Sequence, residues 1–193
     1  KNEAIWFLNE KVIKFSCDTY FIKNRVIRAN ELEGFVPKIQ KSSKHMYIYD
    51  REEGDVFSKN SNLPLFEKLL EYSSTFWKRK ELNEFLKKEF KKNCLNFYKE
   101  KTLTRVKKFF VDFDQKDQPQ IINGEKVPTL EKMFNHIDWD YLSNGLPVRF
   151  HGDFHFENIL WNSEKNSFVF LDWRQDFAGS LEFGDLYYDL AKL

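Results

Sequence analysis

A short polar segment near the end of the sequence carries side chains suited to phosphoryl transfer. It reads His-Gly-Asp-Phe-His-Phe-Glu-Asn over residues 151–158, so that Asp153 and Asn158 stand five positions apart. A β-like apolar run ends at Asp172, 19 positions after Asp153. Moving a phosphoryl group to a hydroxyl requires a carboxylate that orients the hydroxyl and accepts its proton, and hard oxygen ligands that hold Mg²⁺ on the phosphates. A rigid loop and an adjoining strand can direct these three side chains to one point.

Three motifs in this part of the chain resemble a known family. The signature His-Gly-Asp-x-His-x-x-Asn of the aminoglycoside phosphotransferase and choline kinase family, a group of small-molecule kinases, is matched in full at 151–158. Its Asp-Trp pair is matched by Asp172 and Trp173, and its closing pattern Gly-Asp-x-x-Tyr-Asp-Leu-Ala is matched at 184–191. Protein kinases carry Asp and Asn at the same spacing in their catalytic loop. The resemblance is specific over residues 148–193 and much less specific over the rest of the chain.

The resemblance implies a role for each matched residue. Asp153 would be the catalytic base, and Asn158 and Asp172 would be the Mg²⁺ ligands. Asp189 would anchor the catalytic loop, whose two histidines would be structural. The implied cofactors are ATP or GTP together with Mg²⁺.

The N-terminal residues resemble the nucleotide-binding part of the same family. In the run Lys-Val-Ile-Lys-Phe, Lys14 resembles the strand lysine that holds the nucleotide α- and β-phosphates, and Lys11 is the alternative. Side chains alternate along a strand, so these two lysines are expected on opposite faces. A later β-like run resembles the strand and hinge of the adenine pocket, where the backbone of Tyr49, Asp50 and Arg51 would meet the base.

Two features of the family have no match in this sequence. No glycine-rich loop precedes the first β-like runs. The helix glutamate that pairs with the strand lysine cannot be placed, because Glu31 and Glu33 lie close to the expected helix end and Asn24 stands where that glutamate is first sought. The sequence begins at Lys1 rather than Met and stops at Leu193 inside an expected helix, so we expect a fragment with material missing at both ends.

The first third of the chain is predicted to be β-rich with one helix. Residues 4–16 predict a hairpin, residues 19–33 a helix that Asp18 caps and Gly34 stops, and residues 45–50 a further strand.

The remainder is predicted to be mostly helical. The expected elements are long helices over 63–108, a loop or small hairpin over 112–128, a helix over 130–142, two β-like runs at 148–150 and 167–172 separated by a polar loop, and a last helix from near Glu182. The predicted fold class is α+β, a protein-kinase-like fold of two lobes. A truncated β-rich N-terminal lobe would cover residues 1–58 and a helical C-terminal lobe, truncated at its end, residues 59–193.

Simpler interpretations of single features stay open. The segment 151–158 can be an ordinary polar turn, although the two later motifs weigh against this. Lys14 can be a solvated hairpin lysine, and Asp185 can be only the N-cap of the last helix. The lysines of 78–108 alternate with glutamates and indicate a solvated helix face rather than a nucleic-acid surface.

The leading functional hypothesis is an ATP-dependent phosphotransferase that moves the γ-phosphate to a hydroxyl of a small molecule. The family uses amino alcohols, aminoglycosides and sugars as acceptors, and the stretch 172–179 resembles bacterial kinases that serve surface-glycan or phosphocholine-type decoration. Three acidic residues, Asp176, Glu182 and Asp185, would suit a cationic acceptor.

Two other function classes remain as alternatives. Residues 152–155, Gly-Asp-Phe-His, also resemble the Gly-Asp-x-His motif of metallophosphoesterases, but the Gly-Asn-His that such two-metal sites need is missing. A catalytically silent kinase-like binding module is the third hypothesis, and the presence of Asp153, Asn158 and Asp172 together argues against it.

The composition narrows the class of protein. The sequence has 31 Lys+Arg against 30 Asp+Glu, which excludes a strongly basic nucleic-acid binder and an acidic tail protein. A mean hydropathy of −0.63 and the lack of a long apolar run predict no membrane insertion. Cys17 and Cys94 have no zinc-type spacing and fit a reducing compartment, so we expect a cytoplasmic protein whose partner is a small-molecule hydroxyl acceptor. Its oligomeric state is left open.

Overall fold

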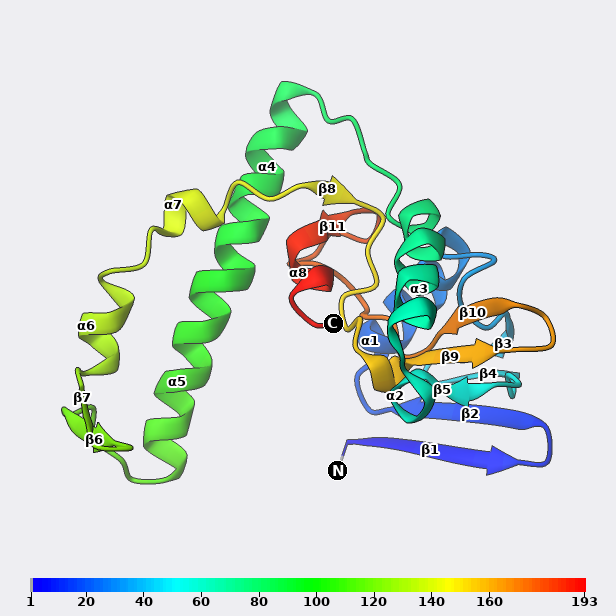
Figure 1. Ribbon diagram of the computed structural model, residues 1–193, viewed down its shortest axis with the longest axis horizontal. Coiled ribbons are helices and arrows are strands. Elements are labelled where there is room, and N and C mark those ends of the chain that lie inside the picture. Colours follow the sequence, from blue (N-terminus) through cyan, green and yellow to red (C-terminus); the bar gives the residue numbers. More distant parts are fainter. Residues whose placement is uncertain (1) are drawn as a thin grey trace.

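The N-terminal residues form a four-stranded antiparallel sheet. The computed structural model describes residues 2–193 (Figure 1). Strands β1 (Glu3–Leu8) and β2 (Lys11–Ser16) form the predicted hairpin, and β3 (Ile39–Ser42) and β4 (Met46–Asp50) complete the order β1-β2-β4-β3. Val12, Lys14 and Ser16 are buried on one face of β2, as the alternation of side chains predicts. Strand β3 was not predicted.

Helix α1 (Thr19–Glu31) packs on this sheet and confirms the expected capping. The Asp18 carboxylate accepts hydrogen bonds from the backbone N–H groups of Tyr20 and Phe21. Gly34 follows the helix with a φ of +85°, a conformation that glycine adopts without strain. Ile22, Arg28 and Ala29 are the buried side chains of the helix.

A second sheet joins early and late parts of the chain. Strand β5 (Asp55–Val56) pairs with β9 (Ile159–Asn162), which pairs with β10 (Ser167–Phe170). Helices α2 (Phe57–Asn60) and α3 (Leu63–Phe76) follow β5, and α3 lies over β9 and β10 in Figure 1. The expectation of a single polar loop between residues 150 and 167 was wrong, because strand β9 lies inside this segment. The apolar run of β9 is short and directly follows the polar motif, so it gives little periodic signal.

A long helix follows and carries a small subdomain at its end. Helix α4 (Glu84–Leu95), a π-helical turn η1 (Asn96–Glu100) and α5 (Lys101–Asp112) form one continuous helix (Figure 1). The hairpin of β6 (Gln120–Ile122) and β7 (Glu125–Val127) confirms the prediction for 112–128. The predicted helix over 130–142 is instead two short helices, α6 (Leu130–Phe134) and α7 (Trp139–Leu142). Asp138 interrupts it by capping α7 with its side chain.

The C-terminal segment closes the fold with short elements. Strand β8 (Pro147–Val148) pairs with β11 (Gly184–Asp185) and not with β10. A 3₁₀ turn η2 (Phe156–Asn158) precedes β9, and α8 (Leu186–Leu190) is the last helix. Asp185 caps α8 at the N–H of Tyr187, so the capping role considered for it is confirmed. None of the helices described over residues 2–193 has the length and apolar character that crossing a membrane requires.

Two hydrophobic cores hold these elements. The first core contains side chains from both sheets, α1, α3 and the segment after β10, and it therefore spans the predicted boundary between residues 58 and 59. The second core joins the long helix to β8 and the C-terminal segment through Phe90, Phe97, Phe150, Phe177 and Phe183. Phe97 and Phe177 stack with ring centroids 4.4 Å apart. Aromatic side chains thus supply much of both cores.

Arg28 connects α1 to the loops of the C-terminal segment. Its side chain is fully buried, with a relative exposure of 0%. The guanidinium donates to the backbone carbonyls of Phe150, His151, Arg174 and Leu181, and it lies over the Phe150 ring at 3.8 Å from the centroid. Burial lowers its pKa to about 9, so the group remains charged at neutral pH. One helix residue thereby satisfies carbonyls from three separate loops.

Replacing Arg28 is therefore expected to destabilise the protein strongly. Arg28→Met keeps an apolar stem, but it leaves the carbonyls of Phe150, Arg174 and Leu181 without this donor, each at a cost of about 1–3 kcal/mol. The His151 carbonyl keeps the Arg174 backbone N–H at 2.8 Å. We expect the free energy of unfolding, measured by urea denaturation, to fall by at least about 3 kcal/mol. The matched control is Lys23→Met at an exposed position of the same helix, which should change it by less than about 0.5 kcal/mol. Equal losses in the two variants would contradict this account.

Candidate active site

A pocket between the N-terminal sheet and the C-terminal loops collects most of the predicted site residues. Its volume is about 380 Å³. Its polar lining comprises Glu3, Lys14, Arg25, Asp153, His155, Asn158 and Asp172. Strands β1 and β2 and helix α1 form one wall, and the 151–158 loop and Asp172, two positions after β10, form the other. Residues more than 120 positions apart in the sequence thus face one cavity.

The loop around Asp153 is held by hydrogen bonds to its own residues. The Asn158 side-chain nitrogen donates to the Asp153 carbonyl oxygen at 3.0 Å and to its carboxylate Oδ2 at 3.3 Å. His155 Nε2 lies 3.5 Å from the same Oδ2, and Lys192 Nζ lies 3.0 Å from Oδ1. Burial acts to raise the pKa of Asp153, but the hydrogen bond and charge of Lys192 outweigh it and lower the pKa. Asp153 is therefore an ionised carboxylate at neutral pH, as a proton acceptor must be.

Asp189 confirms its predicted part as the anchor of this loop. Its buried carboxylate accepts hydrogen bonds from the backbone N–H groups of His151 and Gly152, both at 2.7 Å, and from the Trp77 indole at 3.1 Å. Burial raises the pKa of Asp189 to about 6, while the three N–H donors and Arg28 favour the charged form. The carboxylate is thus mainly ionised at neutral pH. Gly152 has a φ of +88°, and a Cβ there would lie 2.5 Å from the Arg174 side chain, so only glycine fits.

His151 is a structural member of the loop. The imidazole is fully buried, and its Nδ1 accepts a hydrogen bond from the backbone N–H of Asp153 at 3.2 Å. Burial lowers the pKa of His151 to about 3, and the nearby Arg28 charge acts in the same direction. The neutral ring therefore supports the turn that presents Asp153.

Asp172 meets two cations from the N-terminal half. Its carboxylate forms ion pairs with Lys14 and with Arg25, the latter at 3.0 Å. Asp172 has a φ of +57°, which Asp tolerates better than most residues. This turn sends the next residue, Trp173, into the first core, where its indole donates to the Arg25 carbonyl at 3.0 Å. Side chain and backbone thus tie the end of β10 to helix α1.

Lys14, and not Lys11, is the strand lysine at the pocket. Lys14 is 8% exposed, whereas Lys11 lies on the opposite face and pairs with Asp50. Burial lowers the pKa of Lys14 to about 7 and the Arg25 charge acts in the same direction, while the ion pair with Asp172 favours the charged amine. The interpretation of Lys14 as a solvated lysine is therefore wrong.

The carboxylate sought on α1 is absent from the pocket lining, where Arg25 stands instead. The acidic residue near Lys14 is Glu3, which comes from β1 and favours the charged lysine. Sequence reasoning missed Arg25, Glu3 and Lys192. The sequence carries a weak signal for two of these residues. Arg25 lies in an expected helix, and Lys192 directly follows the closing motif.

The expected hinge residues lie away from this pocket. Tyr49 is buried in the first core, and Asp50 is bound by Lys11 and by Gln40. The Arg51 backbone N–H donates to the Glu10 carbonyl at 2.9 Å. None of Tyr49, Asp50 and Arg51 is among the residues that line the pocket. Their assignment to an adenine site remains a prediction.

Comparison with known proteins decides the family. The model of the phosphotransferase enzyme family matches residues 91–193, which is more than half of the chain. The chain belongs to this family. The family resemblance of the three sequence motifs is thereby confirmed, because all three lie inside the matched segment. Comparisons with curated proteins and with solved structures found no match.

The oxygen-bearing side chains at this site fit the Mg²⁺ that the family resemblance implies. Asn158 and Asp172 share the pocket, and carboxylate and amide oxygens are ligands that Mg²⁺ accepts. The Asn158 nitrogen already donates to Asp153, which leaves the amide oxygen to bind a cation. Mg²⁺ commonly combines one or two such ligands with substrate phosphates. Residues 2–193 contain no group of three or more His, Cys, Asp and Glu side chains that could hold a metal ion.

The burial of His151 predicts its titration behaviour. The imidazole should stay neutral from pH 7.5 down to about pH 5, because its pKa is lowered to about 3 in the folded protein. Below the unfolded-state pKa of about 6.5, only the unfolded chain takes up this proton, so this residue's contribution to stability is lost as the pH falls towards 3. Ring ¹³C and ¹⁵N chemical shifts of His151 check this directly. A titration midpoint near 6.5 would contradict the assigned environment.

Proposed function

We propose that this protein is an ATP-dependent phosphotransferase that moves the γ-phosphate to a hydroxyl group of a small molecule. The observation that supports it best is the convergence of Lys14, Asp153, Asn158 and Asp172 on one pocket. Phosphoryl transfer depends on positioning and on charge stabilisation, and these are the side chains it requires. Under this proposal the pocket lies between two lobes of a kinase-like fold.

Each residue has a distinct part in the proposed reaction. Lys14 and Arg25 would hold the phosphates, since both cations project into the pocket beside Asp172. Mg²⁺ bound by Asn158 and Asp172 would neutralise phosphate charge. Asp153 would orient the acceptor hydroxyl and take its proton, because its lowered pKa keeps it ionised. Asp189 and Arg28 would keep the peptide groups of the loop in place.

The ion pairs that Asp172 forms with Lys14 and Arg25 must open before this site can bind a metal ion and a nucleotide. Lys14 and Arg25 both pair with the carboxylate that would bind the metal ion. Bound phosphates offer these cations alternative anions, and Mg²⁺ offers Asp172 an alternative cation. Nucleotide and metal should therefore bind together, each releasing partners that the other needs.

Family membership supports phosphotransfer over the phosphoesterase alternative. A catalytically silent module would share the fold but need not bind nucleotide with metal, so the binding experiment below separates it from the proposed enzyme. Repeating the binding experiment with GTP in place of ATP shows which of the two nucleotides the protein prefers.

Thermal stability with nucleotide is the test of the proposed site. Mg²⁺ and ATP together should stabilise the protein by about 2.7 kcal/mol at roughly a hundredfold excess over Kd, and either alone should stabilise it much less. Asp172→Asn should abolish most of this stabilisation because it removes the carboxylate, while asparagine tolerates the positive φ at this position.

The matched control is Asp114→Asn. Asp114 also has a positive φ, of 47°, but it is exposed at the end of α5 and does not line the pocket. This variant should respond to Mg²⁺ and ATP as the unmodified protein does. An equal response of Asp172→Asn, or no response of the unmodified protein to either nucleotide, would refute the proposed function.

A further inference from the structure

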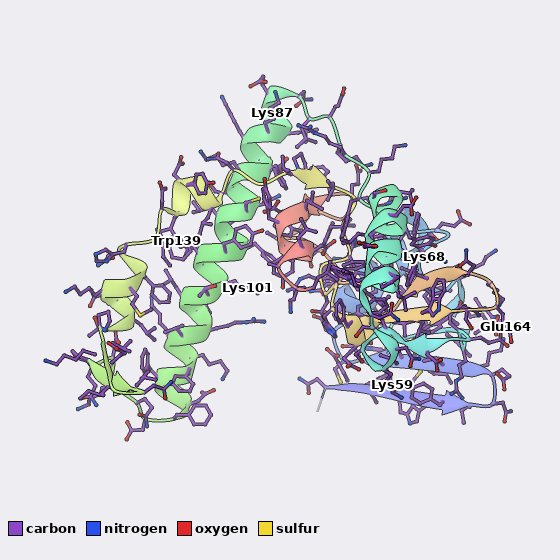
Figure 2. The ribbon with its side chains drawn as sticks, in the orientation of Figure 1. Lys59, Lys68, Lys87, Lys101, Trp139 and Glu164 are labelled. Atoms are coloured by element: carbon purple, nitrogen blue, oxygen red, sulfur yellow. The ribbon has the colours of Figure 1, made fainter. Side chains whose placement is uncertain are left out.

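A group of cations lies on one side of Asp153. Lys101 at the start of α5 and Arg174 after β10 both lie over the Phe97 ring, at 3.6 Å and 4.9 Å from its centroid. Lys101 and Lys192 both lie over the Tyr188 ring, at 5.5 Å and 6.0 Å. Figure 2 labels Lys101 in the middle of the long helix, beside α8. Two aromatic rings thus gather cations from three distant segments.

The group reaches Asp153 directly. Lys192 contacts carboxylate Oδ1 at 3.0 Å, whereas Asn158 and His155 lie at Oδ2. Asn158 also lines the pocket with Asp172, so the Oδ2 side of Asp153 is the side of the proposed nucleotide phosphates. Lys192 therefore lies at the other oxygen, and it connects that oxygen to the cations gathered around the Phe97 and Tyr188 rings.

Lys192 has an ion pair with Asp153, whereas Lys101 and Arg174 lie against an aromatic ring. The amine of Lys101 is half-buried, and its pKa is lowered to about 8 by burial and then by the charges of Arg174, Arg105 and Lys192, against which Asp153 acts. Arg105 stands one helical turn beyond Lys101 on α5. The buried Nε of Arg174 has no hydrogen-bond partner among residues 2–193. Neighbouring cations that repel each other in a partly buried place are typical of an anion-binding site.

Two of the three acidic residues that would favour a cationic acceptor already have hydrogen-bond donors, and none of the three lines the pocket. Asp185 is buried and accepts hydrogen bonds from the Tyr98 hydroxyl at 2.5 Å and from the Leu146 N–H at 2.8 Å. Asp176 accepts a hydrogen bond from the Gly179 N–H at 2.9 Å. Glu182 is exposed. The prediction of a solvated face for the lysine-rich helix does not hold at Lys101, because the amine of Lys101 packs against the Phe97 and Tyr188 rings.

We propose that the acceptor carries an anionic group, a phosphate or a carboxylate, bound by Lys101, Arg105, Arg174 and Lys192 while its hydroxyl lies at Asp153. The inference rests on the proposed function and names its substrate class. Guanidinium and ammonium groups bind such anions by charge-assisted hydrogen bonds. In the free enzyme Lys192 pairs with Asp153, and the anionic acceptor supplies Lys192 with another partner, which frees Oδ1 for the hydroxyl.

Three small hydroxyl compounds that differ in charge test this inference. Glycerol 3-phosphate, glycerol and choline are compared as stabilisers of the full chain at constant ionic strength, with Mg²⁺ and a non-hydrolysable ATP analogue already saturating. We expect glycerol 3-phosphate to raise the melting temperature and the other two compounds to leave it nearly unchanged. Larger stabilisation by choline, or none by glycerol 3-phosphate, would overturn the inference.

A charge-matched pair of variants locates the effect. Lys101→Gln with Arg105→Gln should lose most of the stabilisation by glycerol 3-phosphate, each melting temperature being referred to that variant's own value without the compound. Lys88→Gln with Lys92→Gln removes two exposed cations at the same spacing on α4 and should keep it. Equal retention in both variants would overturn the inference. Stabilisation by the nucleotide analogue alone tests the proposed function, whereas the additional stabilisation by glycerol 3-phosphate tests the anionic acceptor. The two proposals can therefore fail independently.

Discussion

The fixed backbone of residues 150–152 is the constraint on which the rest of the structure depends. Arg28 donates to the carbonyls of Phe150 and His151, and Asp189 accepts from the N–H groups of His151 and Gly152. Both charged groups are fully buried, and each is satisfied mainly by main-chain atoms. Because Arg28 and Asp189 bind backbone groups rather than flexible side chains, they fix the orientation of the peptide planes at the start of the loop. That orientation decides where the carboxylate of Asp153 points.

The same constraint couples the two halves of the site. Helix α1 provides Arg28 to the loop and, three positions earlier, Arg25 to Asp172. One helix therefore sets both the loop that carries the proposed base and the carboxylate that would bind metal. Helix α1 presents Arg25 to the pocket, and with Lys14 it gives the N-terminal side two cations against the single carboxylate of Glu3. Lys14, Arg25 and the group around Lys101 place positive charge on both sides of Asp153.

The sequence carried the local chemistry of the site but not its long-range partners. The matched motifs pointed to Asp153, Asn158 and Asp172, which the structure brings to one pocket, and to Asp189, which binds the loop backbone beside it. Side-chain alternation separated Lys14 from Lys11, the family resemblance favoured Lys14, and the structure shows that Lys14 is the buried one of the two. Strand β9 and the break between α6 and α7 were missed because short elements show little periodicity. Arg25 and Lys192 were missed because tertiary packing brings them to Asp172 and Asp153 from distant segments, and no local pattern encodes this.

A crystal structure with Mg²⁺ and a non-hydrolysable ATP analogue tests the central claim most directly. The account predicts phosphates in contact with Lys14 and Arg25, a metal ion on Asn158 and Asp172, and a terminal phosphate that faces Asp153. The ion pairs of Asp172 with Lys14 and Arg25 should be opened in that complex. A nucleotide bound outside this pocket, or bound with those ion pairs intact and the metal ion on other residues, would contradict the account.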